Sequence, residues 1–281
     1  SLEYGFPISE LQTLSVGLAY QHAELLSSTS STRQAQDWVL NNGNPFTEDI
    51  GGGLTFFGTE FDTYELIAGW TFDSRNRAIF ADRGTRQQLY VGFTGPGSEV
   101  EYVTARYNFT KYQPIFGQWT VMLNTELAYG EALNATTALP PYKQFYGGGP
   151  DSVRGYKESW LGPRDSFGNP YGGNVLVASQ LELIIPIPDK WRSQARASIF
   201  YDIGNVFNTG EVQFTDKLGS PVSYEPEFDE LKTSVGVSVQ WLAPLGFFRF
   251  SYAYPLNEFK GNDRFYGDEV ERFQFSIGQA F

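Results

Sequence analysis

The chain has 281 residues, of which 41% are apolar, 17% aromatic and 19% charged. This apolar content excludes a disordered chain, and no apolar run is long enough to cross a membrane as a helix. Cysteine is absent, His22 is the single histidine, and the net charge is −12. We therefore expect no catalytic residue, no cofactor, no metal and no nucleic-acid partner.

Long segments of period-two alternation predict β-strands along the whole chain, and no amphipathic helix is recognisable. In 117–131, for example, Val121, Leu127 and Tyr129 share one face while Asn124 and Glu126 share the other. The expected strands are 2–7, 11–21, 59–72, 85–95, 99–112, 117–131, 173–186, 194–207, 232–243, 246–255 and a last strand that ends at Phe281.

The connections between these strands differ strongly in length. Segments 26–55, 134–172, 208–229 and 256–268 are long, whereas others, such as 95–98, are tight turns. Most strands carry aromatic and aliphatic residues on one face and small polar residues on the other. These features predict an all-β fold, a transmembrane antiparallel β-barrel of the outer membrane. A soluble β-sandwich is the alternative, but its strands are shorter and its outward faces carry more charge.

The number of strands is odd. About eleven strands are recognisable, whereas single-chain bacterial barrels have an even number. The first strand begins at residue 2, and no signal peptide precedes it. We therefore expect residues 1–281 to be the C-terminal portion of one barrel domain in a longer protein.

Several separated motifs carry a family resemblance. The long segment 134–172 contains Val153-Arg154-Gly155-Tyr156, the strand 194–207 contains Phe-Tyr-Asp-Ile-Gly, and the hairpin after residue 232 contains Trp-Leu-Ala-Pro-Leu-Gly. In this order they resemble the POTRA-bearing outer-membrane assembly and transport family, with the closest likeness to its assembly factors. The resemblance covers essentially the whole chain. It implies a barrel of about sixteen strands, of which this chain lacks the N-terminal strands and the POTRA domains, with 134–172 folded into the lumen.

A guanidinium in the lumen needs carboxylate partners, because desolvating an unpaired charge costs several kcal/mol. Strand parity places Asp202 and Glu182 on inward, polar faces, and the resemblance implies the same pairing with Arg154. The hypothesis is that Arg154 bridges both carboxylates and holds the loop inside the barrel. The alternative is that Arg154 contacts only loop carbonyls.

The last strand alternates aromatic and apolar residues at Phe273, Phe275, Ile277 and Phe281. This pattern is typical of a lipid-facing strand. It also resembles the C-terminal targeting signal of outer-membrane proteins, which is recognised by strand addition. Gly278 weakens this strand or permits a kink, and the resemblance implies a role in a lateral gate between first and last strands.

The resemblance implies a non-enzymatic insertase of a Gram-negative outer membrane, which folds and inserts β-barrel proteins by strand pairing at a lateral gate. The expected partners are unfolded outer-membrane protein clients, membrane lipid and lipopolysaccharide. Assembly-machinery lipoproteins are expected to bind mainly through the POTRA domains. The alternative function is a translocation barrel of the same family, either a two-partner secretion transporter or a TamA-like barrel.

Overall fold

The computed structural model describes residues 1–49, 51–52, 55–244 and 246–278. It is dominated by one antiparallel sheet, in which eleven strands follow one another along a single path and a twelfth, β3 (Asn44–Asp49), pairs with β4. The strands of the path are β1 (Leu2–Ser9), β2 (Gln12–Ser28), β4 (Thr55–Asp73), β5 (Gly84–Thr94), β6 (Tyr102–Pro114), β7 (Thr120–Ala132), β9 (Val175–Ile185), β10 (Ala195–Phe207), β13 (Lys232–Ala243), β14 (Gly246–Pro255) and β16 (Phe273–Gly278). The prediction of an all-β chain with about eleven barrel strands is confirmed.

The remaining elements are short and lie in the connections between these strands. They are α1 (Arg33–Asn41), the 3₁₀ turns Pro141–Lys143 and Phe228–Glu230, and the two-residue strands β8 (Gly155–Tyr156), β11 (Phe214–Thr215), β12 (Pro221–Val222) and β15 (Val270–Glu271). The expectation that the chain has no recognisable helix is wrong, because α1 lies within the connection 29–54. Nine residues are too few for a clear helical period, and tertiary packing stabilises this helix.

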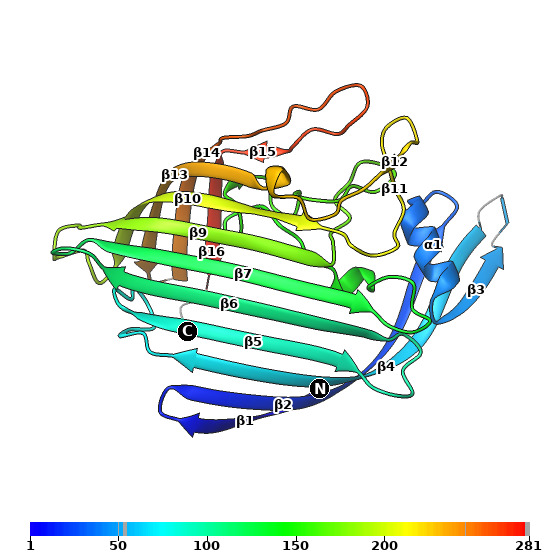
Figure 1. Ribbon diagram of the computed structural model, residues 1–281, viewed down its shortest axis with the longest axis horizontal. Helices are drawn as coiled ribbons and strands as arrows, with labels where there is room; N and C mark the ends of the chain where they lie inside the picture. The colour runs from blue at the N-terminus through cyan, green and yellow to red at the C-terminus, as the bar shows by residue number, and fades with distance from the viewer. Residues whose placement is uncertain (50, 53–54, 245, 279–281) are drawn as a thin grey trace.

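The connections are segregated to two ends of the sheet (Figure 1). At the turn end, β1–β2, β6–β7 and β13–β14 are joined by tight hairpins, and 74–83 and 186–194 are somewhat longer. At the loop end lie the four long connections predicted from the sequence, together with the short connection 95–101. This asymmetry is typical of outer-membrane barrels.

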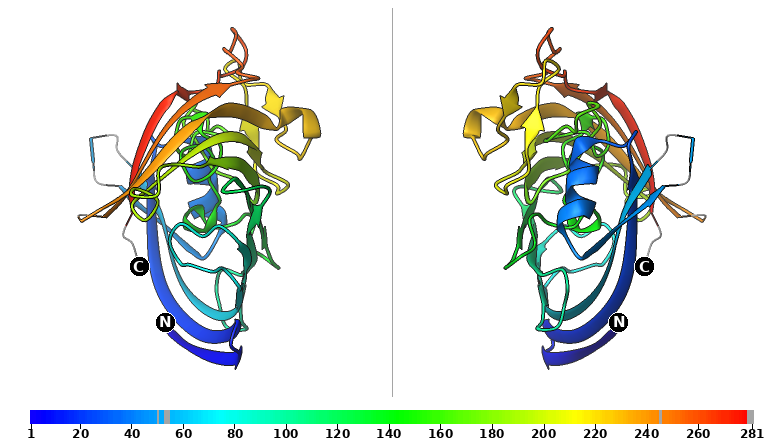
Figure 2. Two further views of the ribbon diagram at one scale, coloured as in Figure 1. Left: turned by 90° about the vertical axis from the view of Figure 1, so that its left-hand side faces the viewer. Right: turned by 90° about the vertical axis from the view of Figure 1, so that its right-hand side faces the viewer.

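The sheet curls around an interior, which the end-on views show (Figure 2). The green segment, which includes most of 133–174, lies inside the curve rather than outside it. Within the described residues, β1 pairs only with β2 and β16 pairs only with β14. The curled sheet therefore has two free edges in this structure.

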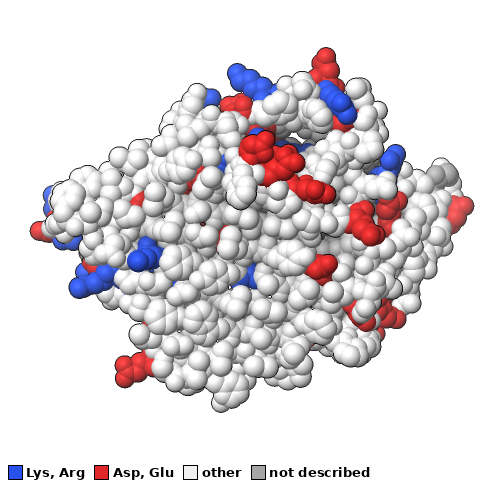
Figure 3. Space-filling model, viewed as in Figure 1, with Lys and Arg blue, Asp and Glu red and all other residues white. Residues whose placement is uncertain are grey.

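Burial is inverted relative to a soluble protein. On β13, Val237 is 54% exposed while its neighbour Ser238 is 2% exposed, and β9 and most of β10 alternate in the same sense. On the face that Figure 3 shows, charged residues are few over the middle of the sheet and are more frequent toward its ends and over the loops. An apolar outer face around a polar interior indicates that the sheet is surrounded by hydrocarbon. Among the described residues, no helix is long and apolar enough to span a bilayer.

The outward face of β2 and β4 changes character toward the loop end. Tyr20 and Tyr64 are cross-strand neighbours with ring centroids 5.4 Å apart. One step further along, His22 lies opposite Asp62, with 2.9 Å between Nδ1 and Oδ1. Aromatic residues followed by charged ones mark the edge of the apolar band. A carboxylate beside His22 was not expected from the sequence, because the pair forms only across the strand register.

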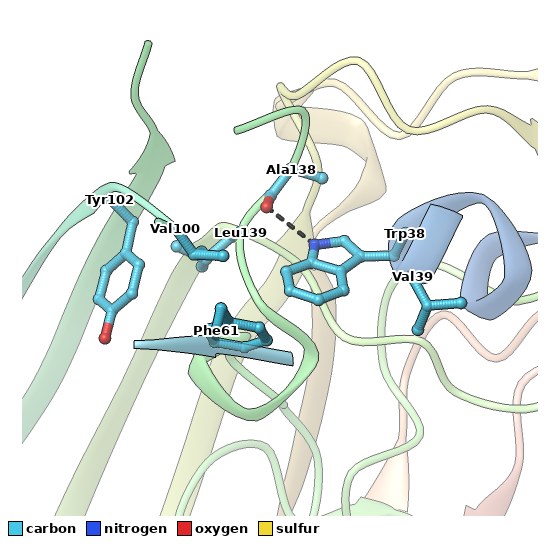
Figure 4. Packing of buried hydrophobic residues seen from close by; sticks show 7 residues of the cluster. All are labelled: Trp38, Val39, Phe61, Val100, Tyr102, Ala138 and Leu139. Atoms are coloured by element: carbon cyan, nitrogen blue, oxygen red, sulfur yellow. Dashed lines mark hydrogen bonds between the residues drawn. The ribbon is translucent and has the colours of Figure 1, made fainter. Parts of the chain in front are cut away.

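A small hydrophobic core caps the loop end above the barrel wall (Figure 4). Trp38 and Val39 of α1 pack against Phe61 of β4, and the indole N–H of Trp38 donates to the carbonyl of Ala138 at 3.0 Å. The remaining members of this cluster are Val100, Tyr102 and Leu139. The side chain of Thr32 caps the helix by accepting from the amide of Ala35. The core ties the connection 29–54 to the loop 133–174.

The inverted burial makes a testable prediction about Val237. We expect Val237→Arg to lower the free energy of unfolding in a bilayer by about 2–4 kcal/mol, because the guanidinium enters hydrocarbon. The control is Leu218→Arg, at a position 73% exposed in the connection 208–231, where we expect little change. Chemical unfolding in lipid measures both, and equal costs would contradict a lipid-facing β13.

Candidate functional site in the barrel lumen

The connection between β7 and β9 carries the motif Val153-Arg154-Gly155-Tyr156 into the interior. All four residues are buried, and Val153 and Tyr156 pack with Leu161 in a small cluster that belongs to the loop itself. The loop therefore carries its own apolar core and presents its polar groups to the barrel wall.

The guanidinium of Arg154 lies between carboxylates from two neighbouring strands. Its Nε and Nη2 donate to the two oxygens of Asp202, each at 2.7 Å, and its Nη1 donates to Glu182 at 2.6 Å. The backbone N–H of Arg154 also donates to Asp202, at 3.0 Å. These side-chain hydrogen bonds go to carboxylates, not to the loop carbonyls considered as the alternative. The structure thus brings together the three residues singled out in the sequence.

Neighbouring inward residues complete this environment. The Arg154 guanidinium carbon lies 3.4 Å from the centroid of the Phe200 ring, and Ser198 donates to the second oxygen of Glu182 at 2.9 Å. Because Phe200 pairs in register with Glu182, both strands deliver these groups at one level of the lumen. Burial alone would lower the pKa of Arg154, but the two carboxylates outweigh it and raise this pKa above its usual value. The residue stays charged.

The next two residues of the motif turn toward the last hairpin. Gly155 has φ +90, and a Cβ there would lie 2.9 Å from the Cβ of Ala253 on β14. Gly155 and Tyr156 form β8, which pairs with β15 just before the last strand. The hydroxyl of Tyr156 donates to Asn257, which follows β14, at 3.1 Å. A glycine is required here by both the backbone angle and the close approach.

Gln274 is a member of this site that sequence reasoning missed. It lies on the inward face of β16, donates to the carbonyl of Tyr156 at 2.7 Å, and accepts from the amide of Gly155 at 3.3 Å. In the sequence, the one indication of an inward position was that Gln274 is polar and lies between Phe273 and Phe275. That parity marks an inward side chain but does not identify its partner.

The other predicted residues of the last strand lie on its opposite face. Phe273, Phe275 and Ile277 are exposed on the apolar outer surface, and the Phe275 ring lies 5.0 Å from that of Phe250. Gly278 is the last residue of β16 and pairs with Phe247. The structure does not join these residues to the Arg154 site. Phe281 lies outside the described residues.

A second contact across the lumen, also missed, comes from the turn end. The turn 74–83 places Phe80 and Ala81 in the interior, with Phe80 at a left-handed φ of 53°. Arg196 of β10 donates to the carbonyl of Ala81, and its guanidinium lies 5.2 Å from the centroid of the Phe80 ring. Phe80 also contacts Phe247 at the start of β14, with ring centroids 5.8 Å apart. Phe80, in a strained backbone conformation, therefore links the turn between β4 and β5 to β10 and β14.

Between this turn and the motif loop lies a cavity of about 550 Å³. Its lining combines Glu182 and Asp151 with the guanidinium groups of Arg86, Arg196 and Arg249. Arg249 of β14 also donates to Asp151 at 2.8 Å. This ion pair is a second contact between the loop and β14. The lumen is polar and charged, and it contains the loop 133–174 at one end and the turn 74–83 at the other.

The described residues contain no group of three or more His, Cys, Asp or Glu side chains placed to hold a metal ion. His22 lies on the outer surface beside Asp62 and Glu60, whereas the Arg154 site lies in the lumen. Arg154, Asp202 and Glu182 satisfy one another as ion pairs and hydrogen bonds, whereas the Nε atoms of Arg86 and Arg249 are buried without a partner among the described hydrogen bonds. Their arrangement suits holding a loop against two walls.

A curled antiparallel sheet with an apolar outside and a loop-filled polar lumen defines a β-barrel protein of the bacterial outer membrane. The model of the Omp85 superfamily domain matches residues 1–281. The chain therefore belongs to the Omp85 superfamily.

Two proteins and one solved structure illustrate this membership. The outer membrane protein assembly factor BamA of Neisseria meningitidis serogroup B is 31% identical over 98% of this chain and 35% of its own length. BamA of Nitratidesulfovibrio vulgaris is 34% identical over 53% of this chain and 17% of its own length. The crystal structure of Haemophilus ducreyi BamA lacking POTRA domains 1–3 superposes with a TM-score of 0.82 at 27% identity. It covers 99% of this chain and 53% of that chain. The chain thus spans about a third of the Neisseria protein.

The ion-pair geometry predicts the outcome of charge reversal. We expect Arg154→Glu to lower the free energy of unfolding by about 3–5 kcal/mol, because Asp202 and Glu182 lose their partner and face a third carboxylate. Asp202→Arg in the same chain restores part of this loss. Chemical unfolding in lipid measures the cycle, and additive damage without rescue would contradict the pairing. The control is Arg192→Glu in the exposed pair with Asp189, which changes stability by less than about 1 kcal/mol.

Two glycines separate backbone strain from steric fit. Gly155 and Gly97 have φ of +90 and +93. A Cβ added at Gly155 would contact Ala253, whereas a Cβ added at Gly97 would have no atom within 4 Å. We expect Gly97→Ala to cost about 1 kcal/mol from strain alone. Gly155→Ala then costs a further 1–3 kcal/mol or so from overpacking. Adding Ala253→Gly removes the excess at Gly155, and the same unfolding measurement tests this. Equal losses at both glycines would mean that the contact with β14 is unimportant.

Proposed function

We propose that this chain is the C-terminal part of the barrel of an outer-membrane protein assembly factor. In this proposal it folds and inserts client β-barrel proteins without enzymatic chemistry, through strand pairing at a lateral gate. The names of the relatives and the matching barrel support the assembly role. The sixteen-stranded closure, the lateral gate and the POTRA domains remain part of the proposal, which the greater length of the relatives supports.

The observation that carries this proposal is the terminal strand. Among the described residues, β16 pairs with β14 from Phe273 to Gly278. Within residues 273–278, the other edge of β16 has no strand partner in this chain, which spans about a third of the Neisseria relative. In the proposed closed barrel this edge faces the first strand, and hydrocarbon cannot satisfy its backbone N–H and C=O groups when that contact opens. A client strand supplies these missing partners.

The proposed partners are those that the family resemblance implies. Unfolded clients pair at the edge of β16, and outer-membrane lipid covers the exposed Phe273, Phe275 and Ile277. Lipopolysaccharide adjoins the charged residues beyond Tyr20 and Tyr64, where the apolar band ends. Assembly lipoproteins bind chiefly through the POTRA domains of the full-length protein.

Translocation through the lumen is the second function that the family offers. It requires the loop 133–174 to leave the interior and hence Arg154 to give up both carboxylates. The buried ion pairs and the contacts of Phe80 at the turn end oppose such a pathway. The lumen geometry therefore favours insertion at the edge over passage through the centre.

Site-specific cross-linking tests the proposed strand pairing. The chain has no cysteine, so the full-length protein can carry a single one, at Ser276 on β16 or at Thr125 on the doubly paired β7. During insertion of a client barrel with one cysteine in its terminal strand, we expect disulfides at Ser276→Cys and none at Thr125→Cys. Normal client insertion with no cross-link at either position would overturn the lateral pathway.

A further inference from the structure

We propose that Gln274 couples the terminal strand to the lumen loop, so that outward movement of β16 and release of Gly155–Tyr156 are one event. The inference rests on the proposed function for its biological use. The coupling itself is a property of this fold that can be measured without a client.

The first step is the way in which Gln274 holds the loop. Its side-chain amide, 3% exposed, donates to the carbonyl of Tyr156 and accepts from the amide of Gly155. In a sheet, a peptide group of a neighbouring strand would donate to this carbonyl and accept from this amide. Here the side-chain amide of Gln274 does both. Both groups are buried, so losing Gln274 removes this acceptor from the amide of Gly155 and leaves the carbonyl of Tyr156 with the amide of Gly149, at 3.0 Å.

The second step is that the segment just before β16 holds the same residues. Val270 and Glu271 of β15 pair with Tyr156 and Gly155, and the amide of Lys157 donates to the carbonyl of Glu269 at 2.9 Å. The segment 269–274 therefore contacts residues 155–157 at four positions, which are 269, 270, 271 and 274. A displacement of β16 away from the barrel strains all of these contacts together.

The third step is the anchor on the other wall. Arg154, adjacent to Gly155, is held by two carboxylates on β9 and β10, and these charge-assisted hydrogen bonds are stronger than the neutral ones of Gln274. The backbone of Gly155 also lies so near β14 that an added Cβ would be 2.9 Å from the Cβ of Ala253. The loop thus cannot follow a moving β16, and the Gln274 contacts break first.

The coupling gives Gln274 a defined role as a positioning residue. It holds β16 against the loop while the proposed gate is closed. Pairing of a client strand with β16 then pulls against the neutral contacts of Gln274 and of 269–271, not against the ion pairs of Arg154. Loss of Gln274 should free both the strand and the loop.

Hydrogen–deuterium exchange of the full-length protein in lipid nanodiscs tests this coupling. For Gln274→Leu we expect the segments 150–160 and 270–278 to exchange about tenfold faster, the change that corresponds to losing one to two net hydrogen bonds. The matched control is Gln240→Leu on β13, an inward glutamine 8% exposed that does not bind the loop among the described hydrogen bonds, and it leaves both segments unchanged.

A second variant covers failure of Gln274→Leu to fold. Gln274→Glu keeps an acceptor for Gly155 but loses the donor to Tyr156, so we expect an intermediate acceleration in both segments. Wild-type exchange in 150–160 for either variant, with or without a change in β16, would overturn the coupling.

Client insertion by the same variants tests the use of the coupling. We expect the rate for Gln274→Leu to differ severalfold from wild type, with Gln240→Leu unchanged. Faster exchange with an unaltered insertion rate would overturn the role in gating. A wild-type protein that inserts no client would instead contradict the proposed function and leave the exchange result standing.

Discussion

Hydrocarbon offers no hydrogen bonds, and this constraint governs the rest of the structure. A strand that crosses it must pair its backbone with neighbours, which explains ladders such as the long one between β2 and β4. The sheet curls, its apolar side chains turn outward, and its polar side chains face inward. The interior is then too polar to collapse into an ordinary core, so it must be filled with partners for those polar groups.

The loop 133–174 meets that need. It brings Arg154 to Asp202 and Glu182, and the cost of burying three charges is offset by four hydrogen bonds and the face of Phe200. From the other end, the turn 74–83 brings the carbonyl of Ala81 to Arg196. Both segments connect distant strands across the lumen, so that the walls are held at their centre as well as along their edges.

The terminal strand is where these restraints are weakest. β16 is held by a short ladder on one side, by neutral hydrogen bonds from Gln274 and β15, and by apolar contacts among its outward aromatic residues. The proposed insertion by strand pairing requires such a balance, because a fully paired edge cannot accept a client and a bare one cannot remain in lipid.

Much of the fold follows from local pattern. Period-two alternation identified the barrel strands, because each strand contacts lipid on one face and the lumen on the other, whichever strands are its neighbours. The same parity placed Asp202 and Glu182 inward and Phe273, Phe275 and Ile277 outward. The motif around Arg154 then indicated which residue the two carboxylates would meet.

Tertiary structure decided what depends on register and on long-range packing. The sequence does not reveal that His22 faces Asp62, that Gln274 meets Tyr156, or that the turn around Phe80 enters the lumen. The helix α1 likewise depends on Trp38 finding Phe61 and the carbonyl of Ala138. Alternation depends only on the lipid and the lumen that flank each strand, so it can be read from that strand alone. The other contacts join segments many residues apart, and they form only when the sheet has brought these segments together.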